Sequence, residues 1–458
     1  MSYYAYVCKI DNLRKHPNAD RLQLGECFGN TVCVDMSYAA GEVGIYFPTD
    51  GQLSVEFAEY NNLLRKKDDA GNSIGGYMDP NKRNVTSIRL RGEKSDGLFL
   101  HLDCISYTKA EVKEGDSFTM LNGHEICQKY IPHSHKQPYE NKVKGNRTRK
   151  RKVPIAPLFV EHADTEQLAY NLGAFHPGDY VEITLKMHGT SQRTGRVPMF
   201  VKYKRSFFDW LLRRPGTPVY DWGYVSGTRR TVLENFDGGY YGSNAFREQH
   251  SKFFEGKLHK GEEVYYEVVG FTDTGASIMG VVSNKKLNDK AFVKQYGEMT
   301  TFSYGCSPTG YMTYEDGSHD ALPQSDFYVY RMTMTNEDGD IVEYTPDYMR
   351  YRCAQMGCKC VPLLWSGIIP AHTGDEAAIS LGQGAGAWIK AKAEEFYDGP
   401  DPIGKTHVRE GVVCRIVNRP AFTAYKHKNF AFKCLEGICK AEETEPDMEE
   451  AEEVKDEA

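Results

Sequence analysis

The chain has 458 residues, of which 40% are hydrophobic and 26% are charged, as is usual for a soluble globular protein, and its formal net charge is −7. A chain of this length exceeds the size at which one hydrophobic core stops growing, so we expect two or more domains. No apolar run approaches the roughly 20 residues of a membrane-spanning helix, no signal peptide is visible, and the twelve cysteines are mostly isolated. We therefore expect a cytoplasmic protein with reduced thiols and no membrane segment.

The N-terminal part predicts an all-β module. From Tyr4 to about Leu121, short strand-like runs alternate with turns rich in Gly, Asn and Asp. Residues 16–22 (HPNADRL) and 91–98 (RGEKSDGL) resemble the turn and strand signatures of OB-fold modules that bind RNA. A five-stranded barrel needs about 120 residues, so we expect an OB-like nucleic-acid-binding β-barrel over residues 1–125. Two ordinary polar turns in a β-barrel would give the same pattern.

The second half of the chain lies between two strongly charged segments. The expected linker, residues 126–156, contains seven cationic side chains between Lys142 and Lys152, which suit either contact with nucleic-acid phosphates or a merely solvated connector. At the other end, residues 441–458 hold ten acidic side chains and one lysine, so the rest of the chain carries about +2. Such an acidic stretch without aromatic residues predicts a disordered tail.

Residues 157–440 mix strand and helix patterns, such as a helix over 385–396 followed by a strand over 410–417, which predicts an α+β domain. A strand over 179–185 leads into Lys186 and, three residues later, Gly189. Covalent nucleotidyltransferases present an attacking amine in this way, at a strand end beside a glycine that lets phosphate approach the main chain. Lys186 is therefore a candidate nucleophile, although an isolated lysine after a strand is usually a surface charge.

Further candidate residues follow along the chain. Arg229 and Arg230 carry guanidinium groups that can hold phosphate oxygens, or they are surface charges. Glu267 lies in the apolar strand 264–270, where its charge needs a partner: a ribose hydroxyl, a metal ion or a structural arginine. In the strand 327–331, Tyr330 could stack on a purine or belong to the core.

The last candidates are a carboxylate and two lysines. Glu410 begins an apolar strand, where it could bind a divalent ion or be an ordinary strand-edge charge. Lys426 and Lys428 lie two residues apart, so on a strand both point to one face and could contact an α-phosphate. A solvated strand face is the alternative.

The order and content of these segments resemble motifs I, Ia, III, IIIa, IV and V of ATP-dependent RNA ligases in the covalent nucleotidyltransferase superfamily, over residues 157–440. The first motif reads Lys-x-His-Gly-Thr, as in the RNA-ligase branch, whereas DNA ligases and many relatives have Lys-x-Asp-Gly. With its expected upstream OB module, the chain is similar to the clade of RNA ligases whose OB domain precedes the catalytic domain.

The resemblance implies an adenylylated Lys186 and a supporting role for His188 in adenylylation or sealing. It implies a set of nucleotide- and metal-binding residues: Arg229 or Arg230 in the second motif, Glu267 at the ribose, Tyr330 on adenine, Glu410 and Glu267 at the metal, and Lys426 with Lys428 at the α-phosphate. One departure is Arg331, because relatives often have an acidic residue after the aromatic. Lys433 is a fallback for the last motif.

The implied reaction joins a 3′-hydroxyl to a 5′-phosphate of RNA through lysyl-AMP and AMP-RNA intermediates, with a nicked duplex and a broken single strand both open as substrates. ATP and a divalent cation, Mg or Mn, are the implied cofactors. Because a lysine amine is normally protonated at pH 7, nearby positive charge from the cation, Lys426 and Lys428 would favour the nucleophilic form. Two alternatives stay open: a capping-type guanylyltransferase that uses GTP, and a non-catalytic RNA-binding protein with a ligase-like fold.

Three other patterns carry less weight. Residues 399–406 (GPDPIGKT) match a P-loop, but they follow a helical pattern, precede a strand and contain two prolines, so we expect no phosphate-binding loop there. Cys353, Cys358 and Cys360 lack a second paired set of zinc ligands, which favours ordinary thiols. Residues 382–386 (GQGAG) lack the preceding strand of a dinucleotide-binding fingerprint and predict a loop.

Overall fold

The structure is a computed structural model that describes residues 3–49, 51–67, 73–130, 153–163, 165–207, 216–229, 231–233, 236, 244–314, 317–371 and 384–436. Most of the expected basic linker, Arg230 and the acidic tail 441–458 lie outside these residues. Within the described ranges, no helix is both long enough and apolar enough to cross a bilayer.

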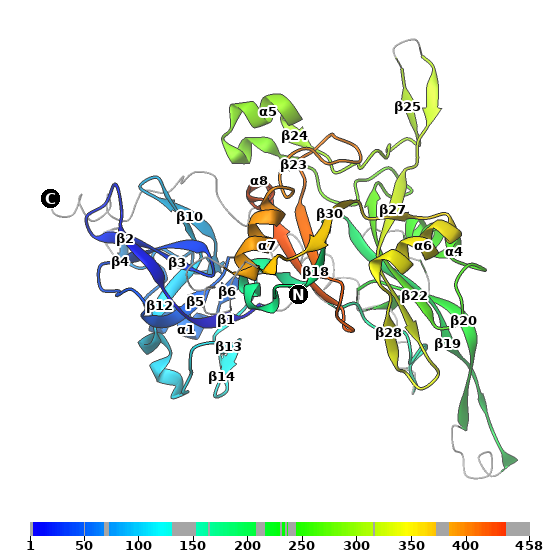
Figure 1. The fold of residues 1–458 in the computed structure, drawn as a ribbon, viewed down its shortest axis with the longest axis horizontal. Helices are drawn as coiled ribbons and strands as arrows, with labels where there is room; N and C mark the ends of the chain where they lie inside the picture. Colours follow the sequence, from blue (N-terminus) through cyan, green and yellow to red (C-terminus); the bar gives the residue numbers. More distant parts are fainter. Residues whose placement is uncertain are drawn as a thin grey trace.

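The N-terminal part is a strand-rich module, blue to cyan in Figure 1. Its larger sheets have the orders β12-β5-β1-β13, β2-β3-β4 and β16-β6-β9. Their strands are β1 (Ala5–Lys9), β2 (Asp11–Lys15), β3 (Leu22–Cys27), β4 (Asn30–Asp35), β5 (Val43–Phe47), β6 (Gly51–Leu53), β9 (Asn84–Val85), β12 (Leu98–His101), β13 (Ser117–Phe118) and β16 (Cys127–Lys129). Two-stranded ribbons and short helices complete it: β7 (Arg65–Lys67), β8 (Ser73–Gly75), β10 (Ser87–Leu90), β11 (Glu93–Asp96), β14 (Met120–Leu121), β15 (His124–Glu125), α1 (Val55–Tyr60) and the 3₁₀ helix η1 (Leu102–Thr108).

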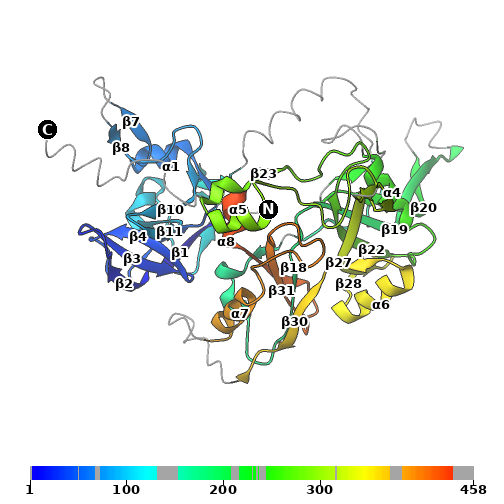
Figure 2. The ribbon, with the colours of Figure 1, turned by 90° about the horizontal axis from the view of Figure 1, so that it is seen from above.

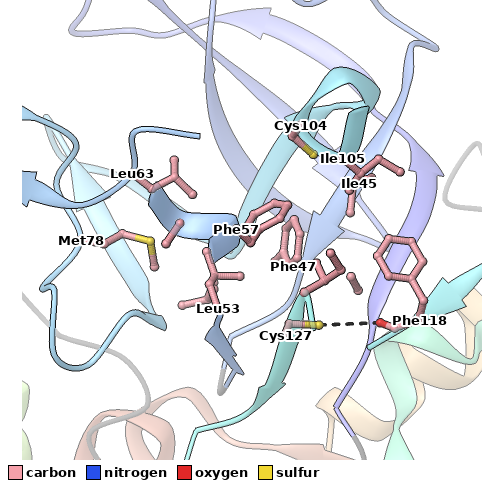
Figure 3. Packing of buried hydrophobic residues seen from close by; sticks show 14 of the residues in the cluster. Ile45, Phe47, Leu53, Phe57, Leu63, Met78, Cys104, Ile105, Phe118 and Cys127 are labelled. Atoms are coloured by element: carbon pink, nitrogen blue, oxygen red, sulfur yellow. Dashed lines mark hydrogen bonds between the residues drawn. The ribbon is translucent and has the colours of Figure 1, made fainter. Parts of the chain in front are cut away.

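This module is held together by a core of buried apolar side chains. Figure 3 shows Phe47 from β5 against Phe57 from α1, with ring centroids 5.1 Å apart. The Cys127 thiol donates to the Phe118 carbonyl at 3.7 Å, which links β16 to β13. The predicted strands are present, but none of the sheets closes into a barrel among the described residues, so the OB-like barrel is not confirmed.

The two larger sheets in the described part of the second half lie at the centre and the right of Figure 1. The five-stranded sheet has the order β17-β32-β31-β18-β30, and the seven-stranded sheet has the order β21-β20-β19-β22-β27-β28 with β29 beside β27. Their bounds are β17 (Glu166–Gln167), β18 (Tyr180–Leu185), β19 (Thr190–Lys204), β20 (Thr217–Gly227), β21 (Val232–Leu233), β22 (Glu262–Gly270), β27 (Ser325–Thr335), β28 (Ile341–Glu343), β29 (Lys359–Cys360), β30 (Leu363–Ile368), β31 (Gly411–Ile416) and β32 (Thr423–Lys428).

Helices and short ribbons surround these sheets. They are η3 (Leu168–Tyr170), η4 (Leu172–Ala174), α4 (Ala245–Phe253), η5 (Asn284–Leu287), α5 (Lys290–Tyr296), α6 (Pro346–Met356), α7 (Ala385–Glu394), α8 (Phe430–Leu435), β23 (Val282–Ser283), β24 (Met299–Thr300), β25 (Tyr311–Thr313) and β26 (His319–Ala321). Apolar residues of α7 pack on the five-stranded sheet, and those of α4 and α6 pack on β22 and β27 of the other sheet. The α+β fold predicted from the sequence is confirmed, with strands predominating.

The turn that contains Lys186 joins the two sheets. Val181, Ile183 and Leu185 alternate into the apolar interior, as expected for β18. After Lys186 the chain leaves the five-stranded sheet and enters β19 of the seven-stranded sheet at Thr190. Residues 186–189 therefore lie where the sheets meet, and side chains from both can converge there.

The N-terminal module contacts the second half close to this junction. The Tyr170 ring lies within 5.2 Å of Tyr6 and 6.0 Å of Phe28, centroid to centroid. The Lys94 ammonium lies 4.2 Å from the centroid of Phe430, the first residue of α8. These contacts place the module beside the C-terminal elements that follow β32 (Figure 2).

Candidate active site

Lys186 and Glu410 form the centre of the site. The Lys186 backbone N–H donates to the Gly411 carbonyl at 3.0 Å, because β18 and β31 are neighbours in one sheet. The Lys186 ammonium then donates to Glu410 Oε1 at 2.5 Å. Glu410 is 2% exposed, and its second oxygen, Oε2, is buried without a hydrogen-bond partner among the described residues.

The electrostatics of Glu410 follow from its cationic neighbours. Burial alone would raise the pKa of this carboxyl, but Lys186 and Lys428 outweigh burial and lower the pKa to about 2. The Lys428 ammonium lies 3.3 Å from the same Oε1 atom. Glu410 is therefore a charged anion between two lysines over the whole physiological pH range.

His188 lies against the same carboxylate in an aromatic pocket. Its ring meets the rings of Phe302 and Phe432 edge to face, at 4.5 Å and 4.8 Å between centroids. Burial lowers the pKa of His188 to about 4, despite the opposing charges of Glu410 and Glu436. The imidazole is thus neutral at pH 7, the form that can accept a proton or bind a metal ion.

A second carboxylate, Glu436, completes a cluster with metal-ligand spacing. Nδ1 of His188 lies 3.8 Å from Glu410 Oε2 and 3.9 Å from Glu436 Oε1. One ligand atom from each residue lies within 4.8 Å of the others, and this is the one such cluster among the residues that the structure describes. Glu436 also accepts a hydrogen bond from Lys428 at 2.5 Å.

Glu267 faces the nucleophile from the other sheet. It lies on β22 opposite Ser191 of β19 and is partly buried. Burial raises its pKa to about 7, against the opposing influence of the positive charge of Lys186. Glu267 does not belong to the cluster of His188, Glu410 and Glu436, so its assignment to the metal remains a prediction.

Tyr330 and Arg229 lie close to Glu267. The Tyr330 hydroxyl and the Ser191 hydroxyl are 3.0 Å apart, and the Tyr330 ring meets the His162 ring edge to face at 5.2 Å. Burial raises the pKa of Tyr330, the Glu267 charge raises it further, and Arg229 lowers it. The structure thus brings both predicted residues to the Glu267 side of the site, whereas Arg230 lies outside the described residues.

The two lysines of β32 share one face, as their spacing predicts. Lys428 pairs with Gly411 and contacts Glu410, while Lys426 pairs with Val413 one step further from the site and is 6% exposed. Lys433, the fallback, lies on α8.

Arg331 has a structural role, which accounts for an arginine at the position where relatives often have an acidic residue. It forms a buried ion pair with Glu343 of β28 at 2.9 Å and stacks on Tyr265 and Phe422. The register of β27 shifts at Tyr330, so Tyr330 and Arg331 do not simply alternate between the two faces of the sheet. Arg331 is directed to Glu343, whereas the Tyr330 hydroxyl lies 3.0 Å from the Ser191 hydroxyl. An arginine at this position is therefore compatible with a nucleotide-binding role of Tyr330.

Several site residues were missed in the sequence. Tyr304 accepts a hydrogen bond from the His188 backbone N–H at 2.8 Å. Arg247 of α4 donates to Thr190 Oγ1 at 2.5 Å and to the Ser191 carbonyl at 3.2 Å, which fixes the start of β19. No local pattern marks Glu436, Tyr304 or Arg247, since each reaches the site only through long-range packing.

The structure explains the glycine at position 189 differently from the sequence, which suggested that it lets phosphate approach the main chain. A Cβ atom there would lie 2.4 Å from the Val268 carbonyl oxygen and 3.0 Å from Glu267 Cγ. The glycine lets the turn pack directly against β22, which brings Lys186 and Glu267 to the same site. Approach of a phosphate to the main chain at this position remains a prediction.

The P-loop match has the surroundings that the sequence predicts. Residues 399–406 follow α7, form turns and lead to β31, so no helix begins after Lys405. Cys353, Cys358 and Cys360 are free thiols, and they form no cluster with metal-ligand spacing in the described part of the chain. Most of residues 382–386 lie outside the described residues.

Comparison with known proteins shows which solved structures have a similar fold. No family model and no curated protein matches the chain. Among solved structures, it is similar to a lysine mutant of the RNA ligase of Naegleria gruberi with ATP and Mn, with a TM-score of 0.56 and 17% identity over 95% of this chain and 98% of that one. The same ligase with PPi matches with a TM-score of 0.56 and 17% identity, over 94% of this chain and 97% of that one. Another lysine mutant of that ligase, with AMP and Mn, matches with a TM-score of 0.53 and 16% identity, over 94% of this chain and 98% of that one. At this identity the likeness establishes the fold, and it extends over nearly the whole of both chains.

Proposed function

We propose that this protein is an ATP-dependent RNA ligase that joins 3′-hydroxyl and 5′-phosphate ends of RNA. The observation that carries the proposal is the cluster of Lys186, His188, Glu410 and Lys428, in which a candidate nucleophile, a neutral imidazole, a buried anion and a second cation meet where two sheets join. The RNA-ligase fold, shared with structures that hold ATP or AMP and Mn, supports the same reaction class.

In the first step the Lys186 amine attacks the α-phosphorus of ATP. A nitrogen–phosphorus bond forms, the bond from the α-phosphorus to the β-phosphate oxygen breaks, pyrophosphate leaves, and the amine loses a proton. In the structure Lys186 donates to Glu410, so the amine must be released from this pair as the nucleotide binds. The Lys428 ammonium lies 3.3 Å from the same oxygen. It can turn from Glu410 to the α-phosphate and stabilise the negative charge there.

The later steps transfer the AMP. A 5′-phosphate oxygen of the RNA attacks the adenylyl phosphorus, the phosphorus–nitrogen bond breaks, and Lys186 is regenerated. The 3′-hydroxyl then attacks the RNA 5′-phosphorus, loses its proton and displaces AMP. Glu267, whose pKa burial raises to about 7, is a titratable group that can accept these protons near neutral pH, whereas His188, with a pKa of about 4, stays neutral.

The residues of the site fit a divalent cation. Glu410 Oε2 is buried and unpartnered, and it lies with one atom each of His188 and Glu436 in a set of two carboxylates and one imidazole that suits Mn and, with added waters, Mg. Bound there, a divalent cation would supply positive charge that stabilises the transferring phosphoryl group.

The test is covalent labelling. Incubation with ATP labelled at the α-phosphate, in the presence of Mg or Mn, should give a protein-bound AMP that Lys186→Met abolishes, and the loaded enzyme should transfer AMP to RNA with a 5′-phosphate. Labelled GTP serves as the comparison, because a capping-type guanylyltransferase would give a GMP adduct. An absence of adduct with both nucleotides and with both metals would disprove an enzymatic function.

A further inference from the structure

Strands β19 and β20 form a ribbon that extends beyond the sheet from which it starts. β22 pairs with β19 only from Thr190 to Gly195, whereas β20 follows β19 as far as Lys204. The 15 residues of β19 span on the order of 50 Å at about 3.3 Å per residue. Figure 1 shows the far half of the ribbon projecting at the lower right, and Figure 2 shows it at the right edge. We call residues 196–207 and 216–224 the arm.

One face of the arm carries a row of aromatic side chains. The cross-strand register and ring contacts place five partly exposed rings on this face: Tyr224, Trp222, Tyr220, Phe200 and Tyr203. The Phe200 centroid lies 4.9 Å from that of Tyr203 and 6.2 Å from that of Tyr220, so the row is continuous along this part of the arm. Partly exposed rings in a row offer flat surfaces on which unpaired bases can stack.

Cationic side chains flank the row. The Arg196 guanidinium lies 5.8 Å from the Tyr224 centroid, and the Lys260 ammonium lies 5.4 Å from the Trp222 centroid. Further out, Lys202, Lys204 and Arg205 are exposed. The register pairs Lys202 with Val219 and Lys204 with Thr217, so these two lysines lie on the other face of the ribbon from the rings. Within residues 196–207 and 216–224, the arm contains four lysines and arginines against one aspartate. This excess of positive charge around exposed rings is complementary to a polyanion whose bases can stack.

The arm is continuous with the candidate active site at both ends. β19 begins four residues after Lys186, and β20 ends two residues before Arg229. Arg247 clamps the start of β19 through Thr190. A nucleic-acid strand that contacts the arm is therefore held in a fixed position relative to Lys186.

We propose that the arm binds a single-stranded segment of the RNA substrate, with its bases stacked on the aromatic row and its phosphates on the flanking cations. The proposal rests on the ligase function and adds a second contact site outside the reaction centre. Trp222 lies opposite Pro198, eight residues beyond Thr190, which corresponds to about 26 Å or about eight nucleotide steps of ~3.4 Å. An RNA that extends only a few nucleotides from the reactive end cannot reach the row, whereas a long one can.

The first test measures binding of a fluorescein-labelled 30-nucleotide single-stranded RNA to the full chain at several salt concentrations. The triple variant Lys202→Ala, Lys204→Ala and Arg205→Ala should bind about 10- to 100-fold more weakly near 0.1 M salt. Its slope of log Kd against log salt should fall by about 2, since each lost phosphate contact removes about 0.7 for a single strand. The control exchanges charge for charge, as Lys202→Arg, Lys204→Arg and Arg205→Lys, and should retain the affinity.

A second variant, Tyr220→Ala with Trp222→Ala, should lose affinity by about five- to 100-fold at every salt concentration with the slope unchanged, because stacking does not displace ions. The triple alanine variant and this one should both form lysyl-AMP at the normal rate and transfer AMP normally to a 5-nucleotide RNA, but transfer it poorly to a 30-nucleotide RNA at low RNA concentration.

Unchanged binding of the long RNA by both variants would overturn the proposal and would leave a protein partner as the occupant of the arm. Failure of the ligase function would appear separately, as absence of an adduct in the unaltered protein, and the binding measurement would still test the arm.

Discussion

The Lys186 ammonium donates to Glu410 Oε1 at 2.5 Å, although 224 residues separate the two in the sequence. This pair ties the strand end that carries the candidate nucleophile to the start of β31 and gives Glu410 a pKa of about 2 in spite of its burial. Both the position of Lys186 and the charge balance of the site depend on this carboxylate.

Glu410→Gln should reduce the rate of lysyl-AMP formation by about 100-fold or more. The amide keeps the shape but cannot offset the charges of Lys186 and Lys428 or bind a cation through an anionic oxygen. The rate is measured with labelled ATP under single-turnover conditions. A circular dichroism melt controls for folding, and a folded variant with a normal rate would show that Glu410 has no part in the step.

Glu436→Gln should raise the Mn concentration that gives half-maximal adduct formation by about 10-fold, the lower end of the usual cost of altering a metal site. Glu436 contributes one of the three ligand atoms that lie within 4.8 Å of one another. Direct Mn binding, followed by electron paramagnetic resonance, should weaken in parallel. Glu298→Gln, at an exposed glutamate that pairs with Lys285, is the matched control and should change neither value.

Gly411→Ala should disturb the site through the backbone. Gly411 has φ +143°, and a Cβ atom would lie 2.1 Å from the His427 carbonyl oxygen on β32. The strand must shift, which displaces the adjacent Glu410, so we expect a lower melting temperature and a strong loss of adduct formation. Gly173→Ala, where a Cβ atom meets nothing within 4 Å, should behave like the unaltered protein.

Glu262→Ala should destabilise the fold by about 3–5 kcal/mol, because it leaves Arg352 as a buried cation without its partner. Arg352 donates to both oxygens of Glu262, at 2.8 Å and 2.7 Å, and this link fastens α6 to β22. Urea unfolding measures the change. By contrast, Glu248→Ala breaks an exposed pair with Lys252 on α4 and should hardly change the free energy of unfolding, because solvent screens this pair. Equal losses in the two variants would contradict the assignment.

His250 should make stability fall in weak acid. Burial lowers its pKa to about 4 from an ordinary value of 6.5, so the unfolded chain binds the proton more readily than the native protein. Its contribution is complete above pH 6.5 and is lost as pH falls towards 4, where the loss reaches on the order of 3 kcal/mol. His250→Gln should flatten unfolding free energy against pH in this window, whereas His319→Gln, on the exposed β25–β26 hairpin, should leave the curve unchanged.

The sequence predicted well the parts of the site that follow from local pattern. A strand before Lys186, an apolar strand around Glu267 and the two-residue spacing of Lys426 and Lys428 are short-range features, and the strands occur where they were expected. Glu436 has no such signal, because its role depends on how α8 packs against His188. In the N-terminal module the strands were predictable, but their pairing was not, since the register depends on contacts between distant segments.

The separation of Lys186 from its partners also has a consequence for synthesis of the protein. A ribosome that has just completed β18 has made the candidate nucleophile, but Glu410, Lys428 and Glu436 are then still more than 220 residues away. Contacts this distant form late, so a nascent or truncated chain holds Lys186 without the carboxylate that positions it. The protein should therefore gain the capacity to react with nucleotide only when its last strands and α8 are in place, and fragments that end before Glu410 should be inert.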